Sequence, residues 1–149
     1  MSMGDEPRRE RSRLARAGVT AVVFGLFVFV VALFPQLISQ DITPGIGILQ
    51  IFIALNGLTA MTLGAYLYMY ATRHRALPPR LREGVGLRLM ATGLVLAYIS
   101  GLADVLGIGS HPSTAVTRPF LGVWQAGGIT FSVLIIAAGI LLYSRRPKG

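Results

Sequence analysis

The polar residues that could do chemistry gather in one stretch of the chain, residues 101–125. This stretch reads GLADVLGIGSHPSTAVTRPFLGVWQ, and it holds Asp104, Ser110, His111 and Arg118 in a chain that is otherwise apolar or basic. Ser, His and Asp are the residue types of a hydrolase triad, but no nucleophile-elbow motif surrounds Ser110. One histidine and one acid are too few ligands for zinc. We therefore expect no catalytic residue and no metal site.

Asp104 and Arg118 are better explained as partners of each other. Asp104 lies near the end of an apolar run, where the helix dipole disfavours an acid, and Arg118 precedes the next run, where the dipole disfavours a base. An ion pair across the connecting loop would relieve both charges. Two alternatives stay open. Asp104 could serve a proton- or cation-linked function, as acids within membrane spans often do, or it could be solvated.

Three glutamines extend this polar region, because Gln36, Gln50 and Gln125 lie at the same ends of their apolar runs. Glutamines in membrane helices can instead link helices through hydrogen bonds worth about 1 kcal/mol each. Both interpretations stay open. The candidate polar pocket comprises Asp104, Arg118, Gln50, Gln125, Gln36 and His111.

Composition identifies the elements that must position these residues. Of 149 residues, 53% are hydrophobic and 13% are charged, and the mean hydropathy is +0.64. A globular domain carries about 25% charged residues. The charges here are clustered, so that apolar runs of about twenty residues contain none, which is typical of an integral membrane protein. The chain has no cysteine, which excludes disulfides and thiolate metal sites.

The apolar runs predict an all-α, polytopic membrane protein with four transmembrane helices, arranged as two hairpins in an up-down bundle. We expect a basic N-terminal tail to be disordered and a second basic tail to close the chain. The predicted segments are the tail 1–16, the transmembrane domain 17–143 with helices at about 17–38, 44–70, 84–106 and 119–143, and the tail 144–149.

The basic residues predict the orientation of these helices. Of the 14 Lys and Arg residues, Arg118 alone lies outside the two tails and the region 73–88. The positive-inside rule therefore places both termini and the middle loop in the cytoplasm. The net charge of +8 is then explained by attraction to anionic lipid headgroups at that face, and we expect no nucleic-acid partner.

Small residues recur every three or four positions in each predicted helix, which puts them on one helix face. Membrane helices gain little from burying apolar surface against each other, so close approach through small residues matters more. We expect these four faces to meet in a left-handed bundle, although some could face a second protomer. The candidate packing residues are Gly25, Gly57, Gly64, Gly93 and Gly139.

The two predicted hairpins match each other in register. A shift of 75 residues aligns Gln50 with Gln125, and a shift of 68 residues aligns Gly25 with Gly93. The match indicates a duplicated hairpin, whose copies would be parallel repeats related by an axis along the membrane normal. The alternative is convergence on the small residues that membrane helices prefer.

The four runs, the basic middle loop and the stretch GLRLMATGLVLAYISGLADVLGIGSHP resemble uncharacterised small four-helix bacterial membrane proteins, which are classed as domains of unknown function. The resemblance covers most of the chain after Ala17 and implies a fold but no activity or site residue. Small multidrug transporters also have four spans, but they carry an acid in the first span, and this chain has none there.

These observations predict a small non-enzymatic protein of the bacterial inner membrane without a cofactor. We expect an accessory or scaffold protein, acting as a homo-oligomer or as a subunit of a larger membrane complex. The alternative is a binding or transport protein for a small molecule, a lipid or protons that uses the polar pocket. A filled interior would favour the first function, and an open cavity lined by the glutamines would favour the second.

Overall fold

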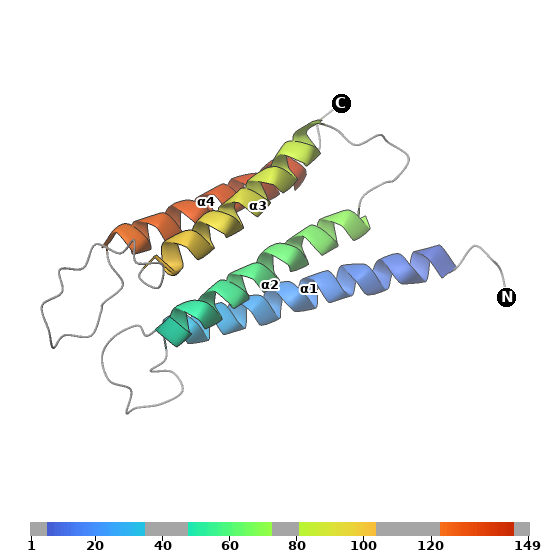
Figure 1. The fold of residues 1–149 in the computed structure, drawn as a ribbon. Helices are drawn as coiled ribbons and strands as arrows, with labels where there is room; N and C mark the ends of the chain where they lie inside the picture. Colours follow the sequence, from blue (N-terminus) through green and yellow to red (C-terminus); the bar gives the residue numbers. More distant parts are fainter. Residues whose placement is uncertain (1–5, 35–47, 73–80, 104–122, 145–149) are drawn as a thin grey trace, which may run out of the picture.

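The computed structural model describes residues 6–34, 48–72, 81–103 and 123–144, which form four α-helices (Figure 1). Each helix is long and apolar enough to cross a membrane. For the described residues this confirms the all-α class with four membrane-compatible helices. The helices are α1 (Glu6–Leu33), α2 (Ile48–Thr72), α3 (Leu81–Gly101) and α4 (Val123–Ser144).

Helix α1 begins at Glu6 rather than at Ala17, so it includes most of the segment that we expected to be a disordered tail. Residues 6–16 hold five Arg and two Glu, together with one Leu and one Ala, and all four residue types are good helix formers. A proline in the first turn is also compatible with a helix start. The helix ends at Leu33, because the residue before a proline, here Phe34, is disfavoured in helical conformation.

In the first hairpin, α1 and α2 touch through their backbones. A Cβ atom placed on Gly25 would lie 2.6 Å from the carbonyl oxygen of Gly57 and 2.6 Å from the amide nitrogen of Met61. A Cβ on Gly18 would lie 2.8 Å from the carbonyl oxygen of Gly64. Real Cβ atoms do not approach backbone so closely, so only glycine permits this packing. The two helices run antiparallel, since the earlier glycine of α1 faces the later glycine of α2.

In the second hairpin, α3 and α4 pack in the same way but slightly less tightly. A Cβ on Gly86 would lie 2.6 Å from the carbonyl oxygen of Gly139. A Cβ on Gly93 would lie 2.6 Å from Cγ1 of Ile136 and 3.0 Å from the carbonyl oxygen of Ser132. The closest atom at Gly93 therefore belongs to the buried side chain of Ile136, with backbone 3.0 Å away, whereas the closest atoms at Gly25 are backbone at 2.6 Å.

The contacts of the second hairpin are those of the first, shifted along the chain. Adding 68 to a residue number in α1 and 75 to a residue number in α2 gives the corresponding pair in α3 and α4. The two hairpins thus share one helix register, as the sequence match predicts. Corresponding pairs are Gly18–Gly64 with Gly86–Gly139, Gly25–Gly57 with Gly93–Ser132, and Gly25–Met61 with Gly93–Ile136.

The two hairpins meet mainly through α2, which packs on α3 and α4 as well as on α1. Leu55 (2% exposed), Ala97 (0%) and Ile136 (4%) form the centre of this core. Among the described helices, α1 has no Cα atom within 8 Å of a Cα atom in α3 or α4. Figure 1 shows the consequence, with α1 lying beside α2 on the outside of the bundle.

Large apolar side chains cover the outer surface of all four helices. Val23, Phe24 and Phe27 of α1 are each more than 60% exposed. In water such a surface would be a liability, but in a bilayer it matches the surrounding hydrocarbon. The most apolar window of α1 is 11% buried and that of α2 is 33% buried, so α1 is the most peripheral helix and α2 the most central.

Candidate functional site

The described charged residues all lie at one end of the bundle. They comprise seven arginines and three glutamates, all within the first part of α1, up to Arg16, or of α3, up to Arg88. The ends of α2 and α4 lie at the same level, because the rings of Tyr66 and Tyr143 are 6.0 Å apart and Tyr143 packs beside Gly86 near the start of α3. We call this the basic end.

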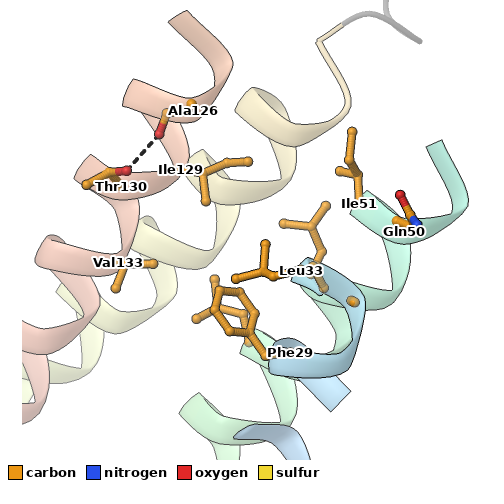
Figure 2. Close-up of a pocket in the computed structure, with 12 residues that line it drawn as sticks. Phe29, Leu33, Gln50, Ile51, Ala126, Ile129, Thr130 and Val133 are labelled. Atoms are coloured by element: carbon orange, nitrogen blue, oxygen red, sulfur yellow. Dashed lines mark hydrogen bonds between the residues drawn. The ribbon is translucent and has the colours of Figure 1, made fainter. Parts of the chain in front are cut away.

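A groove opens between the hairpins toward the opposite end, with a cavity volume of about 290 Å³. We call it the distal groove. Helices α1, α2 and α4 form its walls, and Figure 2 shows Phe29 and Leu33 of α1 facing Ile129 of α4 across it. The volume is close to the lower limit of small-molecule sites. A helix 10–12 Å wide needs more than about 100 Å³ per residue, so the groove admits side chains or a small apolar ligand but not a helix backbone.

The groove lies where a second copy of the α2–α3 contact would be expected. On the α2–α3 side, which we call the closed side, a Cβ on Gly101 would lie 3.0 Å from Cδ1 of Leu55 and 3.1 Å from Cγ2 of Ile51. The absence of a side chain at Gly101 therefore lets two large side chains of α2 pack onto α3. This contact seals one edge of the interface between the hairpins.

On the equivalent α4–α1 side, which we call the open side, small side chains replace the large ones of α2 and a large side chain replaces the glycine of α3. The repeat shifts place Ala126 and Thr130 at the positions of Ile51 and Leu55, and Leu33 at the position of Gly101. Ala126 and Thr130 project less far from α4, and Leu33 occupies space that is free at Gly101. All three residues line the distal groove. The open side therefore has the same helix arrangement as the closed side, but its side chains leave a groove between the helices.

The hairpins also share a polar link on the closed side. The hydroxyl oxygens of Thr59 in α2 and Tyr98 in α3 lie 3.1 Å apart and form a hydrogen bond. The repeat shifts place Leu134 and Val30 at the equivalent positions of the open side. Neither side chain has a polar group, so this link has no counterpart there.

The distal groove has a mostly apolar lining. Gln50 lies at its rim and is partly buried. Thr130 Oγ1 donates a hydrogen bond of 2.8 Å to the carbonyl oxygen of Ala126 within its own helix (Figure 2). The lining holds no titratable side chain. The groove is therefore suited to binding apolar groups and not to acid–base chemistry.

The candidate polar pocket from the sequence is only partly within the described residues. Gln50 lines the distal groove, whereas Gln125 is buried (6% exposed) in α4 and is not part of the lining. Helix α3 ends at Gly101 and a turn follows, so the helix stops short of the predicted position 106. Gln36, Asp104, His111 and Arg118 lie outside the described residues.

Two other polar side chains of the apolar helices, Asn56 and Ser132, form hydrogen bonds within their own helix. Asn56 is exposed, and its Nδ2 donates to the carbonyl oxygen of Phe52 at 2.8 Å. Ser132 Oγ donates to the carbonyl oxygen of Gly128 at 2.7 Å. The hydroxyl of Tyr98 does pair with another helix, through Thr59. Position Thr59 was missed because the sequence suggests one packing face for each helix, whereas α2 packs on two sides.

Metal binding has no support within the described ranges, where no three His, Cys, Asp or Glu residues lie close enough to hold an ion. Both histidines of the chain, His74 and His111, fall outside those ranges. Comparison of the chain with protein-family models, with curated proteins and with solved structures finds no match. The resemblance to small four-helix bacterial membrane proteins therefore stays a prediction.

Proposed function

We propose that this chain is a small non-enzymatic protein of the bacterial inner membrane that serves as an accessory or scaffold subunit of a membrane complex. The distal groove is not the glutamine-lined cavity that would favour a binding function, because its lining is mostly apolar and Gln125 is buried outside it. The open side therefore carries the proposal. In the described residues no Cα atom of α1 lies within 8 Å of a Cα atom in α3 or α4, and the distal groove beside α1 is left unfilled. Membrane helices associate through close packing, so an unfilled groove between helices is a place where side chains of a partner can pack.

The orientation of the subunit in the membrane follows from its charges. With the basic end in the cytoplasm, seven described arginines satisfy the positive-inside rule. Both termini then lie in the cytoplasm and the helices run in up-down order. The distal groove opens in the periplasmic half of the bilayer.

Cysteine labelling tests this orientation. A cysteine at Ser39 or Ser113 should react with an impermeant thiol reagent added from the periplasm, and a cysteine at Leu77 should react only after the membrane is permeabilised. The chain has no native cysteine, so the background is low. The reverse pattern would place the basic end outside and would contradict the proposal.

Site-specific photo-crosslinking tests the partner. A photoreactive residue at Leu33, which lines the distal groove and is 40% exposed, should give discrete protein adducts in native membranes. The matched control is Val95 of α3, which is 57% exposed and lies outside the groove. An adduct at twice the 16.0 kDa mass of the chain would identify a homo-oligomer. An adduct of another mass would identify a different protein and hence a larger complex. Lipid adducts alone at both positions would refute the scaffold function.

The alternative is that the chain binds or transports a small molecule or a lipid through the groove, or couples transport to protons through the predicted polar pocket. The position of Gln50 at the rim of an open groove favours this function, since the glutamines belong to the predicted polar pocket. An Ile129→Trp variant fills the groove from α4 and should expel a copurifying small molecule, detected by mass spectrometry of extracts. If extracts of wild type and variant are identical, this alternative loses its support.

A further inference from the structure

The open side has a second groove at the basic end, with a volume of about 370 Å³. We call it the proximal groove. It lies between the same three helices as the distal groove, and its lining includes Val19, Val23, Ala65, Tyr68, Ile140 and Ser144. It is bounded by the early part of α1 and by the last turns of α2 and α4. Val23 is 61% exposed, so the groove faces the surrounding hydrocarbon from the side.

The groove exposes apolar surface along its whole length. Aliphatic side chains line it toward the middle of the bundle, and Tyr68 and Ser144 lie at its basic end. The backbone of Tyr68 is at the level of Gly18, because a Cβ on Gly18 would lie 2.6 Å from its amide nitrogen. The tyrosine therefore lies at the depth where α1 passes from valines to arginines. An apolar groove that ends beside the arginines of α1 matches a lipid, whose apolar chain ends in a charged headgroup.

Positive charge borders the proximal groove and not the distal one. Arg16 precedes Val19 by one helical turn and Val23 by two, so it lies on the same face of α1. Arg9 lies two turns further along that face, and both arginines are exposed. Long arginine side chains reach the headgroup region readily. Near the distal groove, the described helices carry no charge.

We propose that the proximal groove holds one acyl chain of an anionic phospholipid from the surrounding bilayer, with the lipid phosphate bound at Arg16. The valines of α1, Ala65 of α2 and Ile140 of α4 contact the chain. A helix backbone does not fit, because about 370 Å³ corresponds to roughly three residues of helix. The charge complementarity selects an anionic lipid over a zwitterionic one.

This lipid site is independent of the scaffold function, because it uses the other half of the open side and different residues. The full chain is purified in mild detergent, delipidated, and titrated with phosphatidylglycerol or with phosphatidylcholine of the same acyl chains. Native mass spectrometry then measures the bound fraction for each lipid. Wild type should bind phosphatidylglycerol at least about fivefold more tightly, which is the effect of one basic residue near an anionic surface.

Two variants separate the contributions of the headgroup and the chain. Arg16→Gln should lower the affinity for phosphatidylglycerol about fivefold and leave that for phosphatidylcholine unchanged. Val23→Trp should fill the groove and weaken the binding of both lipids. Each variant has a matched control on α3, namely Arg88→Gln and Val95→Trp. These controls alter an exposed arginine and an exposed valine. Both controls should bind the two lipids as tightly as wild type.

Three results would overturn the lipid site. The first is equal affinity of wild type for the two lipids. The second is an effect of Arg88→Gln as large as that of Arg16→Gln, which would show that diffuse charge and not a site attracts the lipid. The third is unchanged phosphatidylglycerol binding in Val23→Trp. None of these bears on photo-crosslinking at Leu33, so failure of this proposal and failure of the scaffold function are distinguishable.

Discussion

On the closed side of the molecule Ile51 and Leu55 pack against Gly101, whereas on the open side Ala126 and Thr130 lie across a groove from Leu33. These are equivalent positions of two hairpins with one internal register. The difference shows that packing within each hairpin and packing between the two hairpins depend on different residues. Glycines determine how each hairpin closes, and the sizes of three other residues determine whether one hairpin packs fully on the other.

The largest expected effect distinguishes the two hairpins themselves. Gly25→Leu should cost about 3 kcal/mol or more, because the new side chain meets backbone atoms 2.6 Å away that cannot move aside. Gly93→Leu should cost somewhat less, since the nearest backbone atom there, the carbonyl oxygen of Ser132, would lie 3.0 Å from the new Cβ. Denaturant titration in mixed micelles measures both. Gly127→Leu is the control, because a Cβ there meets nothing within 4 Å, and a similar loss in all three variants would refute the packing argument.

The next effect compares the closed side with the open side. Leu55→Ala should cost about 2–5 kcal/mol by leaving a cavity in the core between the hairpins. Thr130→Ala, at the equivalent position of the open side, should change stability by less than about 0.5 kcal/mol because its side chain is exposed. Thermal unfolding of both variants in the same detergent provides the measurement. Equal losses would mean that the open side is also tightly packed.

A smaller effect concerns charges that the second hairpin has and the first lacks. The repeat shifts place Gln36 and Thr43 where the second hairpin has Asp104 and Arg118. If the latter form an ion pair, Asp104→Asn and Arg118→Gln should each destabilise the protein more than the double change does, with a coupling of about 1 kcal/mol. The same cycle at Gln36 and Thr43 should show no coupling. Additive effects at Asp104 and Arg118 would remove the pair.

The smallest effect tests the polar link of the closed side. A double-mutant cycle of Thr59→Val and Tyr98→Phe should give a coupling energy of about 0.6 kcal/mol, the average for hydrogen bonds between membrane helices. Thr62→Val is the control, because Thr62 Oγ1 donates to the carbonyl oxygen of Leu58 in its own helix. Coupling between Thr62 and Tyr98 of the same size would show that the measured energy does not come from the hydrogen bond.

The sequence predicts the helices and their pairing within each hairpin well, because both depend on local patterns. Uncharged apolar runs identify the helices, and glycines at steps of seven, such as Gly18 and Gly25, lie where α1 meets α2. The start of α1 was predicted too late because hydropathy marks where a span begins and not where helical conformation begins. Arginine and glutamate continue a helix beyond the apolar run.

The packing between hairpins and the grooves was not predicted, and the reason is physical. Ile51 and Leu55 in the core are the same residue types as Ile53 and Leu49, which are exposed. In a membrane both environments are apolar, so hydrophobicity carries no signal for the central helix. The repeat alignment does contain the asymmetry, since Leu33 aligns with Gly101. The candidate polar pocket lies largely outside the described residues, so its assembly stays a prediction.

The separate closure of each hairpin also bears on how the protein is made. A pair of helices joined by its own glycines is a complete unit for insertion, and the first pair can enter the membrane and close while the second is still being synthesised. A gene split between residues 72 and 81 would then encode two polypeptides that insert on their own. Association of the two polypeptides would depend on the few side chains around Leu55, Ala97 and Ile136. Coexpression of the two halves would therefore directly test how the hairpins associate.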